Sequence, residues 1–125
     1  MPTGAPGDEN LFRNVVLAID GLSTEIGSAT ASSGAATCNA RIGKITTESL
    51  TTAAAAEYTL TLTNSKIAAG DFVLASVDKK SSAGTPGIGG CTVTAGQVII
   101  TVTNLHASAA FDGAIQINFM VVKAL

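Results

Sequence analysis

Three side chains of this chain belong to types that often do chemistry, one histidine and two cysteines. Because His106 is the sole histidine, an imidazole general base, metal ligand or pH switch would have to use it. It follows an expected strand, in the segment 105–108, and no Cys–His or His–Glu spacing surrounds it, so the sequence indicates no metal site. We expect a loop histidine that makes a local hydrogen bond.

Cys38 and Cys91 both lie on expected strands. A disulfide between them is one interpretation. The first ten residues, however, have neither a basic start nor an apolar stretch, which predicts no secretory signal and synthesis in a reducing cytoplasm. We therefore favour two buried thiols that act as small hydrophobic side chains. No base is paired with either cysteine in the sequence, so neither is expected to be a nucleophile.

Two further patterns could indicate a site, a glycine-rich stretch and a set of acidic residues. The glycine-rich stretch 84–90 lacks the strand–loop–helix context and the Gly-Lys-Ser/Thr ending of a phosphate-binding loop, and we interpret it as a plain loop. The acidic residues Asp8, Glu9, Asp20 and Glu25 are scattered, and the chain has one tyrosine and no tryptophan to form a sugar platform. We expect no enzyme, no catalytic residue, no metal and no cofactor.

The composition excludes other functions. Charged residues make up 13% of the chain, against about 25% in a typical soluble domain, and the net charge is −2. Nucleic-acid binding needs a basic surface, which this chain lacks. The longest apolar runs, such as residues 15–19, are too short to span a membrane. Because a free domain normally displays many charges, such a surface is typical of a protein that lies within an assembly.

Alternating apolar and polar residues predict strands along most of the chain. The clearest lies at 57–64. Others are expected at 36–42, from 44 to 50, at 71–77 as a buried strand, at 91–94 paired with 97–104 as a hairpin, and at 113–123. We expect a loop or thin edge at 27–37, a turn at 53–56 and a loop at 78–90. Residues 11–20 fit either a strand, which we favour, or a short helix.

These seven or eight strands, with no convincing helix, predict an all-β fold, an antiparallel β-sandwich or jelly roll. Its core is expected to contain Leu60, Leu62, Phe72, Val98, Ile100, Val102, Ile115, Ile117, Phe119 and Val121. The segment 61–64, Thr-Leu-Thr-Asn, returns as Thr-Val-Thr-Asn at 101–104. This repeat suits two similar halves of a sandwich, and chance likeness between threonine-rich strands explains it equally well.

Four stretches resemble small structural proteins of tailed bacteriophages: residues 43–54, 58–64, 98–107 and 115–122. The resemblance covers roughly residues 38–122. It implies a capsid decoration (cement) protein, a β-sandwich or jelly roll that binds the outer surface of the head as a dimer or trimer and stabilises the shell. The family offers no catalytic motif, so no residue inherits a role.

Residues 1–37 lie outside the resemblance, and the proline and glycine residues at 1–10, without periodicity, predict an extended segment. We expect an extended N-terminal arm at 1–12 and a β-sandwich domain at 13–125. Asn10, Leu11 and Phe12 of the arm are predicted to contact the capsid or a neighbouring subunit. The expected partners are the major capsid protein and further copies of the chain, with no nucleic acid and no membrane. The alternatives are a component of a tail or a head fibre and a receptor- or carbohydrate-binding virion protein.

Overall fold

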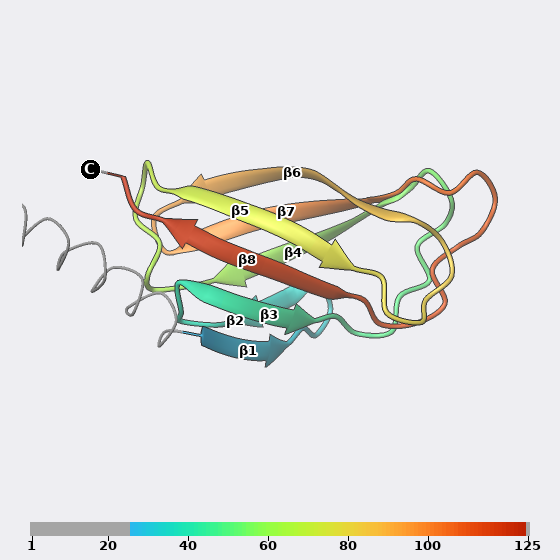
Figure 1. Cartoon of the computed structure of the whole chain (residues 1–125), viewed down its shortest axis with the longest axis horizontal. Coiled ribbons are helices and arrows are strands. Elements are labelled where there is room, and N and C mark those ends of the chain that lie inside the picture. The colour runs from blue at the N-terminus through green and yellow to red at the C-terminus, as the bar shows by residue number, and fades with distance from the viewer. Residues whose placement is uncertain (1–25, 125) are drawn as a thin grey trace, which may run out of the picture.

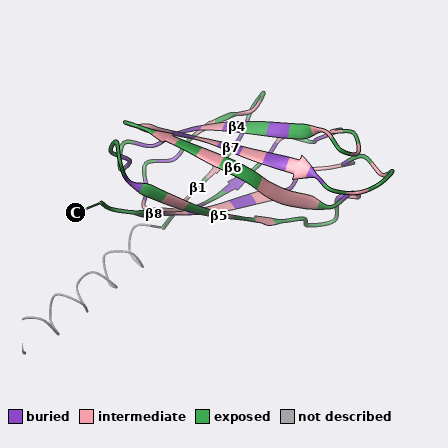
Figure 2. Ribbon diagram, turned by 90° about the horizontal axis from the view of Figure 1, so that it is seen from above, coloured by how far each residue is buried: buried purple, intermediate pink, exposed green. Residues whose placement is uncertain are grey.

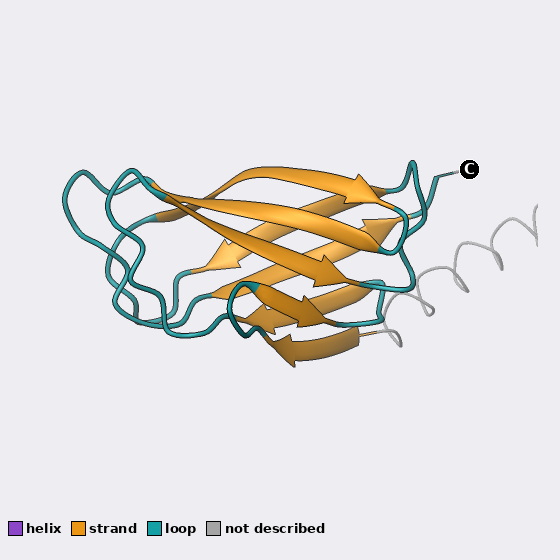
Figure 3. Cartoon of the chain, turned by 180° about the vertical axis from the view of Figure 1, so that it is seen from behind, coloured by secondary structure: helices purple, strands orange, loops and turns teal. Residues whose placement is uncertain are grey.

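The computed structural model describes residues 26–124, which form eight β-strands and no helix (Figure 1). The strands are β1 (Ile26–Thr30), β2 (Ala35–Thr37), β3 (Ile42–Thr46), β4 (Glu57–Thr63), β5 (Phe72–Asp78), β6 (Pro86–Thr94), β7 (Gln97–Asn104) and β8 (Gln116–Val122). They make two stacked sheets of four strands (Figures 1 and 3). The β8 sheet has the order β1-β3-β8-β5, and the β7 sheet has the order β2-β4-β7-β6. The predicted all-β sandwich of seven or eight strands is confirmed.

The sheets are mixed, whereas the sequence predicted antiparallel ones. β1 pairs with β3, and β2 pairs with β4, in parallel; the other pairs are antiparallel. The cause is that the chain changes sheet at each of its first three connections. The turn between β1 and β2, closed by the bridge between Ser32 and Ala35, reverses the chain into the other sheet. Among β1 to β4, each sheet therefore receives every second strand, and these alternate strands run in the same direction.

The core lies between the two sheets and follows the predicted alternation (Figure 2). Nine of the ten predicted core residues are buried: Leu60, Leu62, Val98, Ile100, Val102, Ile115, Ile117, Phe119 and Val121. Phe72 is the exception, because 64% of it is exposed. In β5 the residues Val73, Ala75 and Val77 face the core instead, so the strand is half-exposed and the prediction of a buried strand is wrong.

Other boundaries also differ from the prediction. The expected strand 36–42 is divided, because β2 ends at Thr37 and β3 begins at Ile42. Gly43 lies between the expected strands 36–42 and 44–50, but in the structure it is inside β3, where a Cβ atom would come within 2.5 Å of the Phe119 ring. β6 begins at Pro86, inside the expected loop 78–90. Residues 27–37 contain the two edge strands β1 and β2, which agrees with the thin edge considered for them.

The repeated sequence at 61–64 and 101–104 places two asparagines in equivalent positions, Asn64 after β4 and Asn104 at the end of β7. Both are fully buried. The backbone N–H of Asn64 donates to the carbonyl of Gly96, which lies before β7, and that of Asn104 donates to Ala56, which lies before β4. Because β4 and β7 are antiparallel neighbours, the two asparagines lie at opposite ends of the sandwich.

Both side chains close the loops that follow them. The Oδ1 atom of Asn64 accepts a hydrogen bond from the backbone of residue 66, and that of Asn104 accepts from residue 106. The Asn64 amide also donates to the carbonyl of Ala40. Asn104 has more partners, because it donates to Thr52 and Ala109 and accepts a second bond from Thr85. The repeat thus corresponds to a repeated structural role within the β7 sheet.

We predict that Asn104→Ala lowers the free energy of unfolding by about 3 kcal/mol, because several buried backbone groups lose their partner at once. Chemical denaturation measures this change. Asn118→Ala is the matched control, because the amide of Asn118 bonds only the side chains of Gln116 and Ser76 on the surface. The control should change stability by less than about 0.5 kcal/mol. Equal effects of the two substitutions would contradict the role given to Asn104.

Candidate interaction surfaces

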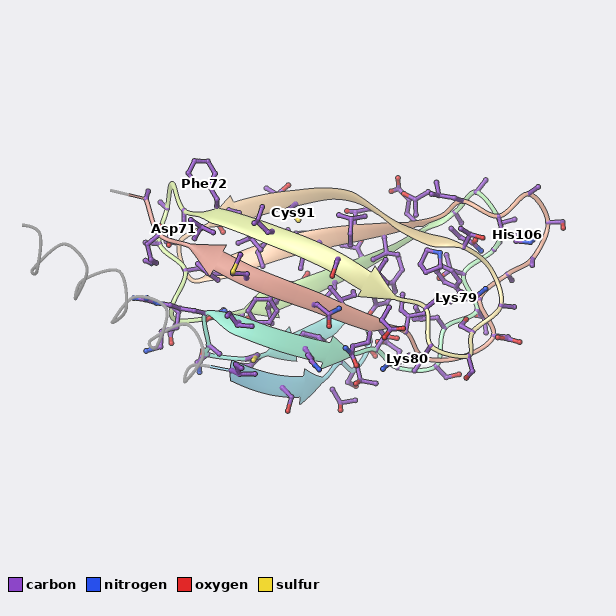
Figure 4. The ribbon with its side chains drawn as sticks, viewed as in Figure 1. Asp71, Phe72, Lys79, Lys80, Cys91 and His106 are labelled. Atoms are coloured by element: carbon purple, nitrogen blue, oxygen red, sulfur yellow. The ribbon has the colours of Figure 1, made fainter. Side chains whose placement is uncertain are left out.

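His106 lies in the loop after β7, at the end of the sandwich opposite to Phe72 (Figure 4). Its Nδ1 atom accepts hydrogen bonds from the backbone N–H groups of Ser108 and Ala109, at 3.0 and 2.8 Å. The predicted local hydrogen bond is therefore confirmed. Because Nδ1 accepts both hydrogen bonds from its own loop, the imidazole stabilises the conformation of residues 106–109.

Cys38 and Cys91 are both free thiols, as predicted. Cys38 is buried, with its Sγ atom packed beside Gly27 and Gly43, and Cys91 is half-buried in β6. Burial raises the pKa of both thiols above the usual value. A raised pKa leaves less of the nucleophilic thiolate, so the geometry fits packing residues.

In the glycine-rich stretch 84–90, Gly84 allows the chain to turn and to pack closely against a neighbouring ring. Gly84 has a positive φ of 85°, and a Cβ atom there would lie 2.7 Å from the Phe111 ring. The N–H of Thr85, which a phosphate would need, donates to Asn104 instead. From Pro86 onward the stretch is part of β6, so this segment is not the plain loop that the sequence predicted.

Two carboxylates, the half-buried Glu48 and the buried Asp71, are held by several hydrogen bonds. Glu48 accepts hydrogen bonds from the Tyr58 hydroxyl and the Gly34 N–H, at 2.8 and 2.7 Å. Burial alone would raise the pKa of Glu48, but the hydrogen bonds outweigh this effect, and the pKa is lowered. The pKa of Tyr58 is raised by burial, by its hydrogen bond to Glu48 and by the charge of Glu48. Glu48 thereby fixes the turn between β1 and β2 against β4.

Asp71 is buried at the other end of the sandwich, just before β5 (Figure 4). Its carboxylate pairs with Lys123 and accepts hydrogen bonds from the N–H groups of Ala68 and Ala124. The Lys123 bond, followed by the two backbone bonds, lowers the pKa of Asp71 to about 2. Asp71 thus fastens the residues after β8 to the loop before β5.

Among residues 26–124, no group of three His, Cys, Asp or Glu side chains could hold a metal ion. Nor does this part of the chain contain a helix that could cross a membrane. The residues Asp8, Glu9, Asn10, Leu11, Phe12, Asp20 and Glu25 lie outside the described residues. The outer surface of the described part has two broad faces, one on each sheet.

The outer face of the β7 sheet is covered by threonines. The strand register aligns Thr59 with Thr101, Thr63 with Gln97, and Thr61 with Ile99. We call this surface the threonine face; its threonines are Thr37, Thr59, Thr61, Thr63, Thr92, Thr94, Thr101 and Thr103. Glu57 is the only charged residue in the four strands of this sheet.

The outer face of the β8 sheet is apolar at one end of the strands and polar at the other. At one end the register aligns Ile26, Ile42, Met120 and Leu74 in a row across all four strands. Phe72 and Val122 pair beside this row, and these six residues form what we call the apolar patch. Ile26, Phe72, Leu74 and Val122 are exposed by 60, 64, 57 and 40%. Figure 4 shows the Phe72 ring projecting away from the sandwich.

The other end of the same face is polar. The next two rows contain Ser28, Lys44, Asn118 and Ser76, and then Thr30, Thr46, Gln116 and Asp78. A shallow depression of about 250 Å³ lies at the boundary, between Leu74, Ser76, Asn118 and Met120. The patch was not predicted from the sequence, because Phe72 was assigned to the core. The sequence does contain an indication of the patch. Both β5 and β8 carry apolar residues at both alternating positions, so each strand places apolar residues on its outer side as well as in the core.

No family model, no curated protein and no solved structure matches this chain.

We predict that the free energy of unfolding falls as the pH is lowered from about 5 to about 2, because Asp71 has a lower pKa in the folded protein than in the unfolded chain. Such a group stabilises the fold above its unfolded pKa, and the contribution disappears once the folded carboxylate is protonated. Asp71→Asn should therefore be less stable than the wild type near neutral pH and should show a shallower loss in acid. Denaturation curves at several pH values measure both effects. Parallel pH profiles for the two proteins would contradict this role.

Proposed function

We propose that this chain is a capsid decoration protein of a tailed bacteriophage, which binds the outer surface of the head as an oligomer and stabilises the shell. The proposal rests on the resemblance of residues 43–54, 58–64, 98–107 and 115–122 to phage structural proteins, together with the surface of the sandwich. The observation that carries it is the near absence of charge from both broad faces.

Only three charged residues occur in the eight strands, Lys44, Glu57 and Asp78. Desolvating a charge on association is expensive, and the centres of protein interfaces are depleted in charged residues. The hydroxyl and methyl groups of threonine are short and lose little side-chain entropy when they are covered, unlike lysine or glutamate. A threonine face whose strands contain Glu57 as their one charged residue is therefore suited to lie against another protein.

Weak contacts are sufficient for this function. On a symmetric shell the same contact is repeated many times, and oligomeric binding multiplies modest affinities through effective concentration. A decoration protein then needs a rigid body and a broad complementary surface rather than a deep pocket. The sandwich supplies the rigid body, since its core and both loop ends are fixed by buried contacts. We assign the capsid contact to the threonine face.

We predict that Thr101→Lys weakens binding of the purified protein to undecorated heads of the encoding phage by tenfold or more, about 1.4 kcal/mol. Thr101 lies in the middle of the threonine face, so a lysine there would bring an unpaired charge into the contact. Its long stem lets the ammonium reach water in the free protein, so the fold should be unaffected. Co-sedimentation with heads measures the affinity, and circular dichroism checks the fold.

Ala107→Lys is the matched control, because Ala107 is exposed in the loop after β7, away from both faces. It adds the same charge and should bind heads like the wild type. If Thr101→Lys also binds like the wild type, the threonine face is not the contact. If the wild-type protein does not bind heads at all, the decoration function itself is wrong, and a tail or fibre component becomes the better interpretation.

A further inference from the structure

The apolar patch on the β8 sheet is a second surface, on the side of the sandwich opposite to the threonine face. It holds aliphatic, aromatic and thioether side chains, and none of its six residues is charged: Ile26, Ile42, Phe72, Leu74, Met120 and Val122. The neighbouring row is polar, so the patch has a sharp boundary along the strands. Four of these side chains are at least 40% exposed, so a peptide that covers them removes apolar surface from water and gains free energy.

The size of the patch limits what covers it. Four strands at a spacing of about 4.8 Å give a width of about 14 Å. The patch extends by one or two residue pairs along the strands, so its area is on the order of 200 Å². A stable contact between two folded subunits buries about 800 Å² on each partner. The patch is therefore too small for a subunit interface by itself, and it fits a short peptide segment.

The connectivity of the chain indicates which segment this is. Ile26, the first described residue, is itself a member of the patch, so the covalent link to the preceding segment lies at the patch. Within those residues the run Val15-Val16-Leu17-Ala18-Ile19 is uniformly apolar. Five residues reach up to about 17 Å when extended, which matches the width of the patch. Residues 20–25 reach up to about 20 Å and include Gly21, which permits a reversal of direction.

We propose that residues 15–19 bind the apolar patch of the same chain. Because the segment is tethered to the patch by six residues, its effective concentration there is high, and the contact forms within one molecule in preference to between two. This contact covers the exposed side chains of β5 and β8. It leaves residues 10–12, which are nearer the N-terminus, available for other partners. The inference concerns the free protein and does not depend on the capsid function.

The two methionines of the chain provide a direct test, because Met120 lies in the patch and Met1 does not. In the full-length protein, labelled with ¹³C at the methionine methyl groups, Leu17→Asp should shift the Met120 signal and leave the Met1 signal unchanged. It should also increase the fluorescence of the apolar dye ANS several-fold, since the patch becomes exposed. Leu22→Asp, a matched change between the segment and Ile26, should do neither.

A second variant reports the contact itself. Leu17→Met adds a third methyl signal, and we expect cross-relaxation between the methyl group introduced at position 17 and that of Met120. The absence of this cross-relaxation, together with a Met120 signal that Leu17→Asp does not shift, would overturn the proposal. A Met120 signal that changes on dilution, with dimers in sedimentation, would also overturn it, because a second copy would then cover the patch.

Discussion

A buried amide must form its hydrogen bonds inside the protein, and this requirement at Asn64 and Asn104 organises the ends of the sandwich. Each asparagine ends one of the two central strands of the β7 sheet, and each holds the residues around it through bonds to backbone groups. The amide of Asn104 alone connects the loops before β4, before β6 and after β7. The loops are thereby fixed in place by polar contacts, while the strands between them are held by apolar packing.

This arrangement determines where function can reside. Residues whose types could do chemistry stabilise loops instead. His106 accepts hydrogen bonds from its own loop, and the N–H of Thr85 in the glycine-rich stretch donates to Asn104. The carboxylates of Glu48 and Asp71 fix the β1–β2 turn and the end of β8 in the same way. The described part of the chain thus presents two broad faces of different character, one lined with threonine and the other partly apolar.

The sequence predicted β4 and β7 well because the apolar residues of each strand lie mostly on one side. In β4, Tyr58, Leu60 and Leu62 alternate with threonines, so one register alone buries the apolar side. In β5 both sides begin with apolar residues, Phe72 and Leu74 on one and Val73 on the other, and alternation cannot tell which side faces the core. The register with β8 decides this, and register is a tertiary property. The parallel pairs were missed for a related reason, since strand patterns do not reveal that a turn crosses to the other sheet.

The surfaces were less predictable than the core, because they depend on how several strands combine. The apolar row of Ile26, Ile42, Met120 and Leu74 draws one residue from each of four strands that are far apart in the sequence. Each residue alone is unremarkable on a strand, and only the register brings the four together. The low charge of the chain, by contrast, was visible from its composition. The fold shows where this matters, because few charged residues lie in the strands that form the two broad faces. In the function that we propose, such faces bind by shape complementarity, and the overall avidity depends on how many of these contacts the shell offers at once.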